Sequence, residues 1–150
     1  CTGCRRGCTG LHLGWVAFSI VWRAGQGLMD SAERATLERI ADALEETRQP
    51  AWVDVHSLRA WRSGDVHHVD LHLVAPRFFS VEELHRMGDT LEAAVLERAA
   101  LGGETIVHFD PCRPRDCSSC AFPDCPVRSH PFAKREPFTF ERATREDVPI

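Results

Sequence analysis

The sequence lacks any cluster of basic residues and any interleaving of basic with aromatic side chains, and its formal net charge is −4 at pH 7. Nucleic-acid-binding proteins usually present such basic surfaces, so nucleic acid is not an expected partner. The mildly acidic balance instead suits a protein that handles cations. The chain also lacks an initiating methionine and the three-part pattern of a signal peptide. We therefore expect these 150 residues to be part of a longer protein.

A full-length transmembrane run is missing as well. Residues 11–29 are the most apolar stretch, but Arg23 interrupts it, and a bilayer span needs about 20 apolar residues. Two interpretations stay open: a buried helix, or the last part of a transmembrane helix with Trp22 and Arg23 near the interface. Residues 1–10 are expected to be an irregular start. They contain three cysteines to which the pattern gives no role: Cys1, Cys4 and Cys8.

The next segments alternate between helical and extended patterns. Residues 31–48 place apolar side chains at helical spacing and stop before Pro50. Residues 52–62 and 66–75 alternate polar and apolar side chains, as half-buried strands do. The Ser-Gly-Asp sequence at 63–65 between them is typical of a tight hairpin turn.

A second helix and a third strand follow. Ser80 and Glu83 have the spacing of a capping box, and the helix behind them is expected to run to about Ala100 and to stop at Gly102–Gly103. Residues 105–110 are then the third strand. This order predicts an α+β fold, a ferredoxin-like or metallochaperone-like αββαβ domain. Its helices are expected to cover one face of a small sheet rich in antiparallel pairing.

Histidines are the unusual feature of the three strands. Because alternate residues share a strand face, His72 lies opposite an apolar face, His108 lies beside Asp110, and His56 shares its face with Leu58. If the apolar faces pack on the helices, the histidines gather on the open side of the sheet. Imidazole and carboxylate groups bind divalent metals. The pattern therefore predicts a metal site, with solvated polar strand ends as the alternative.

Four further cysteines follow the third strand with the spacing C-x4-C-x2-C-x4-C: Cys112, Cys117, Cys120 and Cys125. Four thiolates at such spacing can hold one tetrahedral zinc or a similar soft ion. Disulfides or a redox-active C-x2-C pair remain alternatives. The rest of the tail is rich in proline and shows little periodicity, so we expect it to be irregular and to become loose toward residue 150.

Taken together, the segments resemble the C-terminal cytosolic domain of cation diffusion facilitators, which are proton-coupled efflux transporters for zinc, iron and manganese. Five pieces lie in the family's order: LMD at 28–30, VHSLRAWRSGD at 55–65, VDLHL at 69–73, EELHRMGDTLEAAV at 82–95 and VHFDPC at 107–112. The resemblance implies an αββαβ domain that regulates transport, forms a homodimer and binds metal at the dimer interface. Zinc is the expected metal, with Fe²⁺, Mn²⁺, Co²⁺ or Cd²⁺ as alternatives.

The resemblance also implies roles for individual positions. The metal ligands would be His56, His72, His108 and Asp110 from one chain and His85 from the other. Asp30 matches an acidic residue at the cytosolic end of the last transmembrane helix, implicated in holding the membrane helices together.

The implied division of the chain has three parts after the irregular start: residues 11–30 end a transmembrane helix, 31–111 form the dimerisation domain, and 112–150 form the cysteine-rich tail. Residues 31–150 would lie on the cytoplasmic side of the inner cell membrane. The family's transport site lies on earlier helices, which this sequence does not contain.

Two other classes of function stay open. The first is a free-standing soluble metallochaperone or metal sensor with the same fold. The second is a metal-dependent hydrolase that uses His56, His72 and Asp110 with a metal-bound water. Against the hydrolase, the sequence offers no separate general base and no loop that would hold a phosphate. We therefore expect a protein that is not an enzyme.

Overall fold

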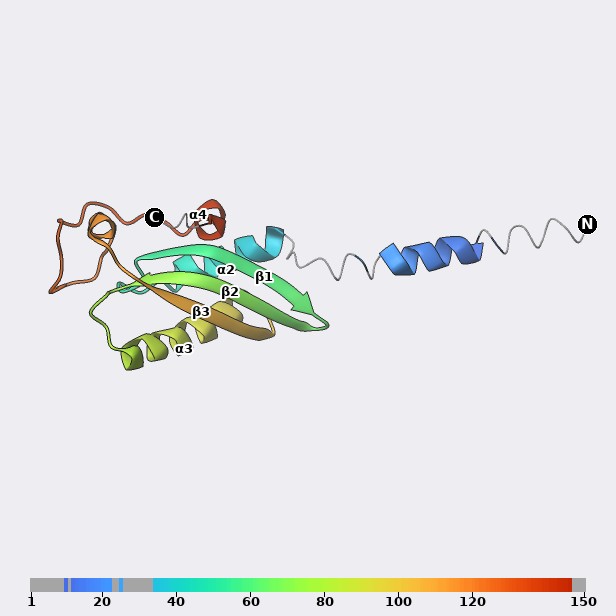
Figure 1. Cartoon of the computed structure of the whole chain (residues 1–150), viewed down its shortest axis with the longest axis horizontal. Helices are drawn as coiled ribbons and strands as arrows, with labels where there is room; N and C mark the ends of the chain where they lie inside the picture. Colours follow the sequence, from blue (N-terminus) through green and yellow to red (C-terminus); the bar gives the residue numbers. More distant parts are fainter. Residues whose placement is uncertain (1–9, 11, 23–24, 26–33, 147–150) are drawn as a thin grey trace, which may run out of the picture. The chain divides into compact units, whose positions relative to one another are not determined.

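The computed structural model describes residues 10, 12–22, 25 and 34–146, and the chain divides into two units, Cys1–Asp30 and Ser31–Ile150. The second unit confirms the predicted α+β fold with the order αββαβ (Figure 1). Its elements are α2 (Arg34–Glu46), β1 (Asp54–Ser63), β2 (Val66–Ala75), α3 (Val81–Arg98), β3 (Gly103–Pro111), the 3₁₀ helix η1 (Pro114–Ser118) and α4 (Phe140–Thr144).

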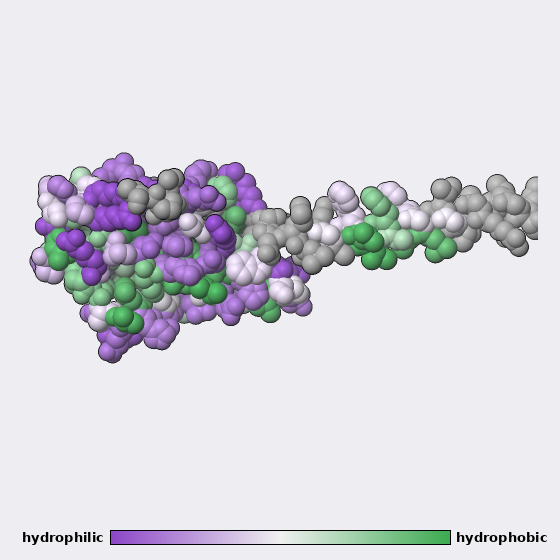
Figure 2. Space-filling model, viewed as in Figure 1, coloured by the Kyte–Doolittle hydropathy of each residue, from purple (hydrophilic) through white to green (hydrophobic). Residues whose placement is uncertain are grey.

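The first unit is described only in part. Residues 12–22 are helical, and Figure 2 shows apolar side chains along this segment; the large exposed ones are Leu13, Trp15, Val16, Phe18, Ile20, Val21 and Trp22. None of the described helices is both long enough and apolar enough to cross a bilayer. The assignment of residues 11–30 to a transmembrane helix stays a prediction. Asp30, Cys1, Cys4 and Cys8 lie outside the described residues.

The sheet has three strands in the order β1-β2-β3. β1 and β2 pair antiparallel through the predicted hairpin, in which Gly64 adopts a φ of +63°. β2 and β3 pair parallel, with α3 as the connection between them. One face of the sheet packs on α2 and α3 around a core of aliphatic side chains that includes Ile40, Leu44, Val55, Leu71, Leu73, Leu91 and Val95. The other face is therefore left for polar groups.

The start of α3 is as predicted, and its end differs by a few residues. Ser80 accepts a hydrogen bond from the backbone N–H of Glu83, and the Glu83 carboxylate accepts one from the backbone N–H of Ser80 at 2.7 Å. The helix ends at Arg98, and Ala100, with a φ of +51°, takes the left-handed position expected of Gly102. Helix termination here does not depend on glycine.

The regular alternation predicted for β1 is wrong at one position. The pairing of β1 with β2 shifts between His56 and Arg59, and Ser57 lies in the left-handed region with a φ of +52°. This is the geometry of a β-bulge, which inserts one extra residue into a strand. As a result Leu58 joins the core, on the opposite side from His56.

The prediction that the tail becomes loose toward residue 150 is also wrong for its described part, which ends at residue 146. Phe138 is 1% exposed and belongs to the main core, and Ala143 of α4 is fully buried in it. Arg142 donates to the buried Asp54 at 2.7 Å, and Arg145 pairs with the same carboxylate. These contacts are between residues nearly ninety positions apart, so the local pattern of the tail gave no sign of them.

Candidate metal centre

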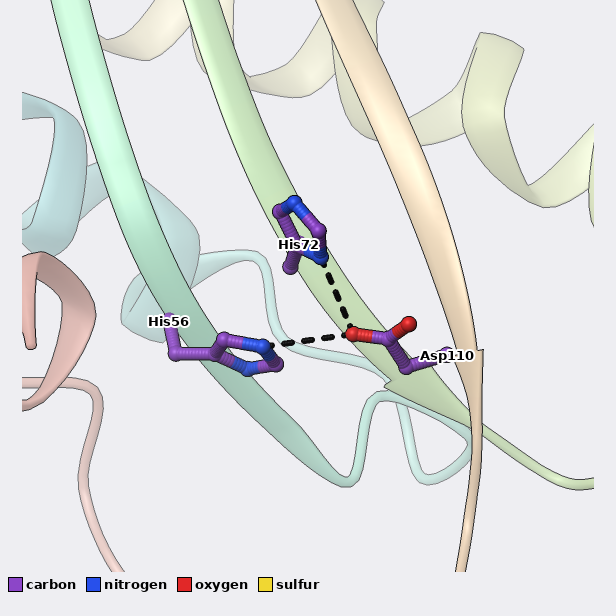
Figure 3. Close-up of side chains that lie close together, drawn as sticks. All are labelled: His56, His72 and Asp110. Carbon is purple, nitrogen blue, oxygen red and sulfur yellow. Dashed lines mark hydrogen bonds and ion pairs between the residues drawn. The ribbon is translucent and has the colours of Figure 1, made fainter. Parts of the chain in front are cut away.

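Strand register places three histidines in one row across the sheet. His56 on β1 lies opposite His72 on β2, which lies beside His108 on β3. The ring centres are 5.1 Å apart for the first pair and 4.9 Å apart for the second. The row lies on the face that α2 and α3 leave uncovered, as Figure 3 shows for His56 and His72, with helices behind the strands. The predicted gathering of histidines on one side of the sheet is thus present.

Asp110, two residues after His108, reaches back into this row (Figure 3). Its Oδ2 lies 3.0 Å from Nδ1 of His72 and 3.2 Å from Nε2 of His56. One ligand atom from each of these three residues lies within 4.8 Å of the others. His56 is 3% exposed, whereas the side chains of His72 and Asp110 are 37% and 39% exposed. The group therefore has a buried side and a side open to a further ligand.

Two imidazole nitrogens and one carboxylate oxygen are a ligand set typical of zinc sites. Three protein ligands leave the fourth tetrahedral position for water, substrate or another chain. The cavity beside this set is lined by further carboxylates and by guanidinium groups. The arrangement fits capture of a metal ion.

Local backbone geometry positions the buried member of the group. The bulge at Ser57 follows His56 directly, and the Ser57 N–H donates to the Arg145 carbonyl at 2.9 Å. An open cavity of about 320 Å³ adjoins the site; its lining includes Asp54, His56 and Asp110 from the strands and Arg113, Arg115, Asp116 and Arg145 from the tail. Sequence reasoning missed the tail residues, because nothing in their spacing relates them to the strands.

The other two predicted ligands lie outside this group in the single chain. His108 pairs with Asp70 through an Nε2–Oδ1 distance of 3.1 Å, and its side chain is 53% exposed. His85 is exposed on α3, and α3 packs against the opposite, apolar face of the sheet. The structure does not bring His85 to the row within one chain. Its contribution from a second chain stays a prediction.

The four predicted tail cysteines are brought together around a separate cavity. They are free rather than disulfide-bonded. Cys117 and Cys120 are buried, and Cys112 and Cys125 are partly exposed. All four line one cavity together with Arg113 and Asp116.

The fold and the site together define a small metallochaperone-like α+β domain with metal-ligating side chains on its open sheet face. A sequence profile for the "Cation efflux protein, cytoplasmic domain" matches residues 32–112. The chain belongs to the cation efflux family, and the matched part is that family's cytoplasmic domain. The resemblance drawn from the sequence is confirmed.

Individual relatives agree with this assignment. The cation-efflux pump FieF of Yersinia pestis (strain Pestoides F) is 31% identical over 107 residues, which cover 69% of this chain and 34% of the pump. FieF of Yersinia pseudotuberculosis serotype O:3 (strain YPIII) gives the same values. This chain thus spans about a third of the length of these relatives.

Solved structures agree as well. The Zn form of CzrB, described as a zinc transporter, superposes with a TM-score of 0.51 and 31% identity. The match covers 56% of this chain and 93% of that one. A second CzrB structure gives a TM-score of 0.50 and 32% identity over 55% of this chain and 99% of that one. The metallochaperone-like fold class is confirmed.

Proposed function

We propose that this chain is the cytosolic regulatory part of a divalent-cation efflux transporter, and that it binds a zinc-type ion between two copies of itself. The observation that carries the proposal is the group formed by His56, His72 and Asp110 on three neighbouring strands. Its ligand atoms are already close together, and its outer side is open. The matched family profile and the CzrB structures support the same role.

In the proposed site the three clustered residues bind the ion from one chain. His108, whose side chain is half exposed, and His85 of the partner subunit complete the ligand set at the homodimer interface. Zinc is the first candidate, because the matched CzrB structure is a Zn form. Such nitrogen and oxygen ligands also accept Fe²⁺, Mn²⁺, Co²⁺ or Cd²⁺.

The proposed mechanism is thermodynamic linkage. An ion that contacts both chains binds the closed dimer more tightly than the separated one, so it shifts the population toward the closed form. Its positive charge also offsets the repulsion between carboxylates such as Asp110 that the two chains bring together. We propose that this change reaches the membrane helices through Asp30 and the helix that follows it.

The corresponding location is the inner cell membrane, with residues 31–150 on the cytoplasmic side and residues 11–30 as the end of the last transmembrane helix. The relatives named as efflux pumps support this placement. The apolar side chains exposed along residues 12–22 also support it over a free-standing soluble metallochaperone. Partitioning of the full chain into lipid vesicles, compared with a chain that begins at residue 31, distinguishes the two.

The decisive experiment is sedimentation velocity of the full chain with increasing zinc. We expect zinc to shift the wild-type protein to a dimer and His72→Ala or Asp110→Ala to require at least 10-fold more zinc, because loss of even a supporting partner of a metal ligand costs about 10–100-fold in affinity. The matched control is His68→Ala. His68 lies on the same strand face but pairs with Glu104 at 2.8 Å, away from the proposed ion. Equal zinc response in all four proteins would overturn the proposal.

A further inference from the structure

The cysteines of the tail form a second cluster of metal-binding groups that the proposed dimer site does not use. They come from the end of β3, from η1 and from the loop beyond it, and their side chains line one small cavity: Cys112, Cys117, Cys120 and Cys125. All four are thiols. The fourteen-residue segment from Cys112 to Cys125 is therefore folded so that all four of its cysteines line the same cavity.

Arg128 holds the loop in this shape. Its guanidinium donates hydrogen bonds to the carbonyls of Cys117 at 3.1 Å, Cys120 at 3.2 Å and Phe122 at 2.7 Å. Partly buried carbonyls need such partners, and one side chain here serves three of them. These hydrogen bonds from Arg128 to the carbonyls of Cys117 and Cys120 restrain the backbone around the C-x2-C pair.

The surroundings also favour a thiolate at one position. The backbone N–H of Ser129 donates to Sγ of Cys117 at 3.4 Å, and this contact lowers the pKa of the thiol. Metal ions take up the thiolate form, so a thiol that already has an N–H donor is a favourable first ligand.

The spacing of the sulfur atoms bears on how an ion would enter. Within the part of the chain that the structure describes, only the group of His56, His72 and Asp110 has three ligand atoms all within 4.8 Å. The sulfurs are thus grouped around the cavity more widely than in a closed tetrahedral site. Binding would draw the loop inward, which a segment without regular hydrogen-bonded structure beyond η1 permits.

We infer that Cys112, Cys117, Cys120 and Cys125 bind a second metal ion, separate from the dimer site, in a tetrahedral all-sulfur site. Zinc is the expected ion, because it combines tetrahedral geometry with a preference for thiolates. Each thiol that binds releases its proton, and no oxidant or reductant takes part. Cys120 belongs to a small apolar cluster with Val53 and Val74, and Phe122 packs against both this cluster and the main core.

The second site adjoins the first. Arg113 and Asp116 line both cavities, and the Asp116 carboxylate accepts a hydrogen bond from the Arg113 N–H at 2.6 Å. Cys112 follows Asp110 by two residues, and its N–H donates to the Ala75 carbonyl at 2.9 Å. An ion held by the cysteines would therefore fix Arg113 and Asp116, the tail residues that line the cavity beside Asp110.

The test is metal stoichiometry of the full chain, purified under reducing conditions and dialysed against zinc. We expect Cys117→Ser combined with Cys120→Ser to lose one zinc per chain. His72→Ala combined with Asp110→Ala should lose the other ion instead, so the two sites fail separately. With cobalt as the probe, wild type should show thiolate-to-metal charge-transfer absorption, which the cysteine variant should lack and the histidine variant should keep.

The matched control is Ser118→Ala, which changes η1 between the same two cysteines without removing a sulfur. It should keep both ions and the cobalt spectrum. Retention of zinc at the histidine site by the cysteine variant shows that this variant is folded. Unchanged zinc stoichiometry in the cysteine variant would overturn the inference. So would a thiol titration of the denatured, non-reduced protein showing that the tail cysteines are paired as disulfides.

Discussion

The histidine site on the sheet and the cysteine cavity in the tail place their ligands by different means. On the sheet, strand register brings His56, His72 and His108 side by side, and Asp110 is already hydrogen-bonded within the row. In the tail, hydrogen bonds from Arg128 and contacts with the body of the domain position the cysteines. The first arrangement is set by the fold alone. In the proposed cysteine site the loop would have to gain order when an ion binds, so the binding energy would also be folding energy.

The tail depends on a few long-range contacts. Arg48 is the central one: its guanidinium lies 3.6 Å from the centre of the Phe138 ring and donates to the carbonyls of Glu136 and Val53. Burial lowers the pKa of Arg48 to about 10, so it stays charged at neutral pH. Loss of any of these contacts should loosen the attachment of the tail to the body of the domain.

The largest effect is expected from Phe138→Ala. The ring is 1% exposed and belongs to the main core, and replacing a buried aromatic ring by alanine costs about 3–5 kcal/mol. Urea denaturation measures this change in the free energy of unfolding. The matched control is Phe132→Ala, since Phe132 is in the same tail but 48% exposed and should change stability little. Equal effects of the two substitutions would show that the tail does not contribute to the core.

A smaller loss is expected from removing both arginines that hold the buried Asp54. Breaking a buried ion pair costs about 3–5 kcal/mol, and the partial exposure of Arg142 and Arg145 reduces this to about 2 kcal/mol. The double variant Arg142→Ala/Arg145→Ala should also weaken zinc binding by the histidines more than by the cysteines, because Asp54 and Arg145 line the cavity beside His56 and Asp110. Chemical denaturation and zinc titration measure the two effects.

Arg34→Ala is the control for this pair of arginines. Arg34 also joins α4 to the body of the domain, through Glu141 at 3.4 Å, but both side chains are exposed. Exposed ion pairs contribute about 0–1 kcal/mol. If Arg34→Ala destabilised the protein as much as the double variant, burial of Asp54 would not be the reason for the effect.

Substitution of Ser57, at the β-bulge next to His56, should affect the histidine site more than the cysteine site. A β-branched residue tolerates a φ of +52° poorly, so Ser57→Val should cost about 1–2 kcal/mol and displace His56. Ser57→Gly should keep both stability and zinc binding, because glycine adopts this conformation freely. Zinc affinity of the two variants, measured by calorimetry, separates strain from loss of the side chain. A Val variant that binds zinc normally would contradict this account.

Sequence predicted the features that depend on local pattern. Ser80 and Glu83, three residues apart, gave the start of α3, and alternation on β2 and β3 gave the common face of His72 and His108. It failed at Ser57, because a bulge breaks the period of two that places side chains on a strand. The resemblance to a family supplied a prediction that the pattern could not, namely which of the histidines would share one metal site.

The tail shows a second limit of sequence reasoning. Phe138 and Arg142 look like isolated residues in a proline-rich segment, and their partners Arg48 and Asp54 lie nearly ninety positions away. Pattern within a window of ten to twenty residues contains no information on such pairs. Charge alone would not have identified them either, since the chain has many exposed arginines and carboxylates.

The smallest effect is expected at the start of α3, which serves as a baseline for both metal regions. Ser80→Ala removes the hydroxyl that accepts the Glu83 N–H at 3.3 Å. Substitution of a serine N-cap costs about 1 kcal/mol, and urea denaturation is again the measurement. Within one chain neither metal region should change, because this cap lies at the helix rather than on the sheet face. A change in zinc affinity seen only in the dimer would instead support His85, which also lies on α3, as a ligand to the other chain's ion.

The contribution of the same cap to the free energy of unfolding should decrease as the pH falls. The backbone N–H of Ser80 donates to the Glu83 carboxylate and lowers the pKa of Glu83 in the folded protein. A lowered folded-state pKa contributes stability above the unfolded-state pKa, and this contribution disappears as pH falls through the folded-state value. Glu83→Gln should therefore lose this part of the acid dependence of unfolding while keeping the Ser80 hydroxyl. Identical stability–pH curves for wild type and Glu83→Gln in the acid range would show that the cap is held by the hydroxyl alone.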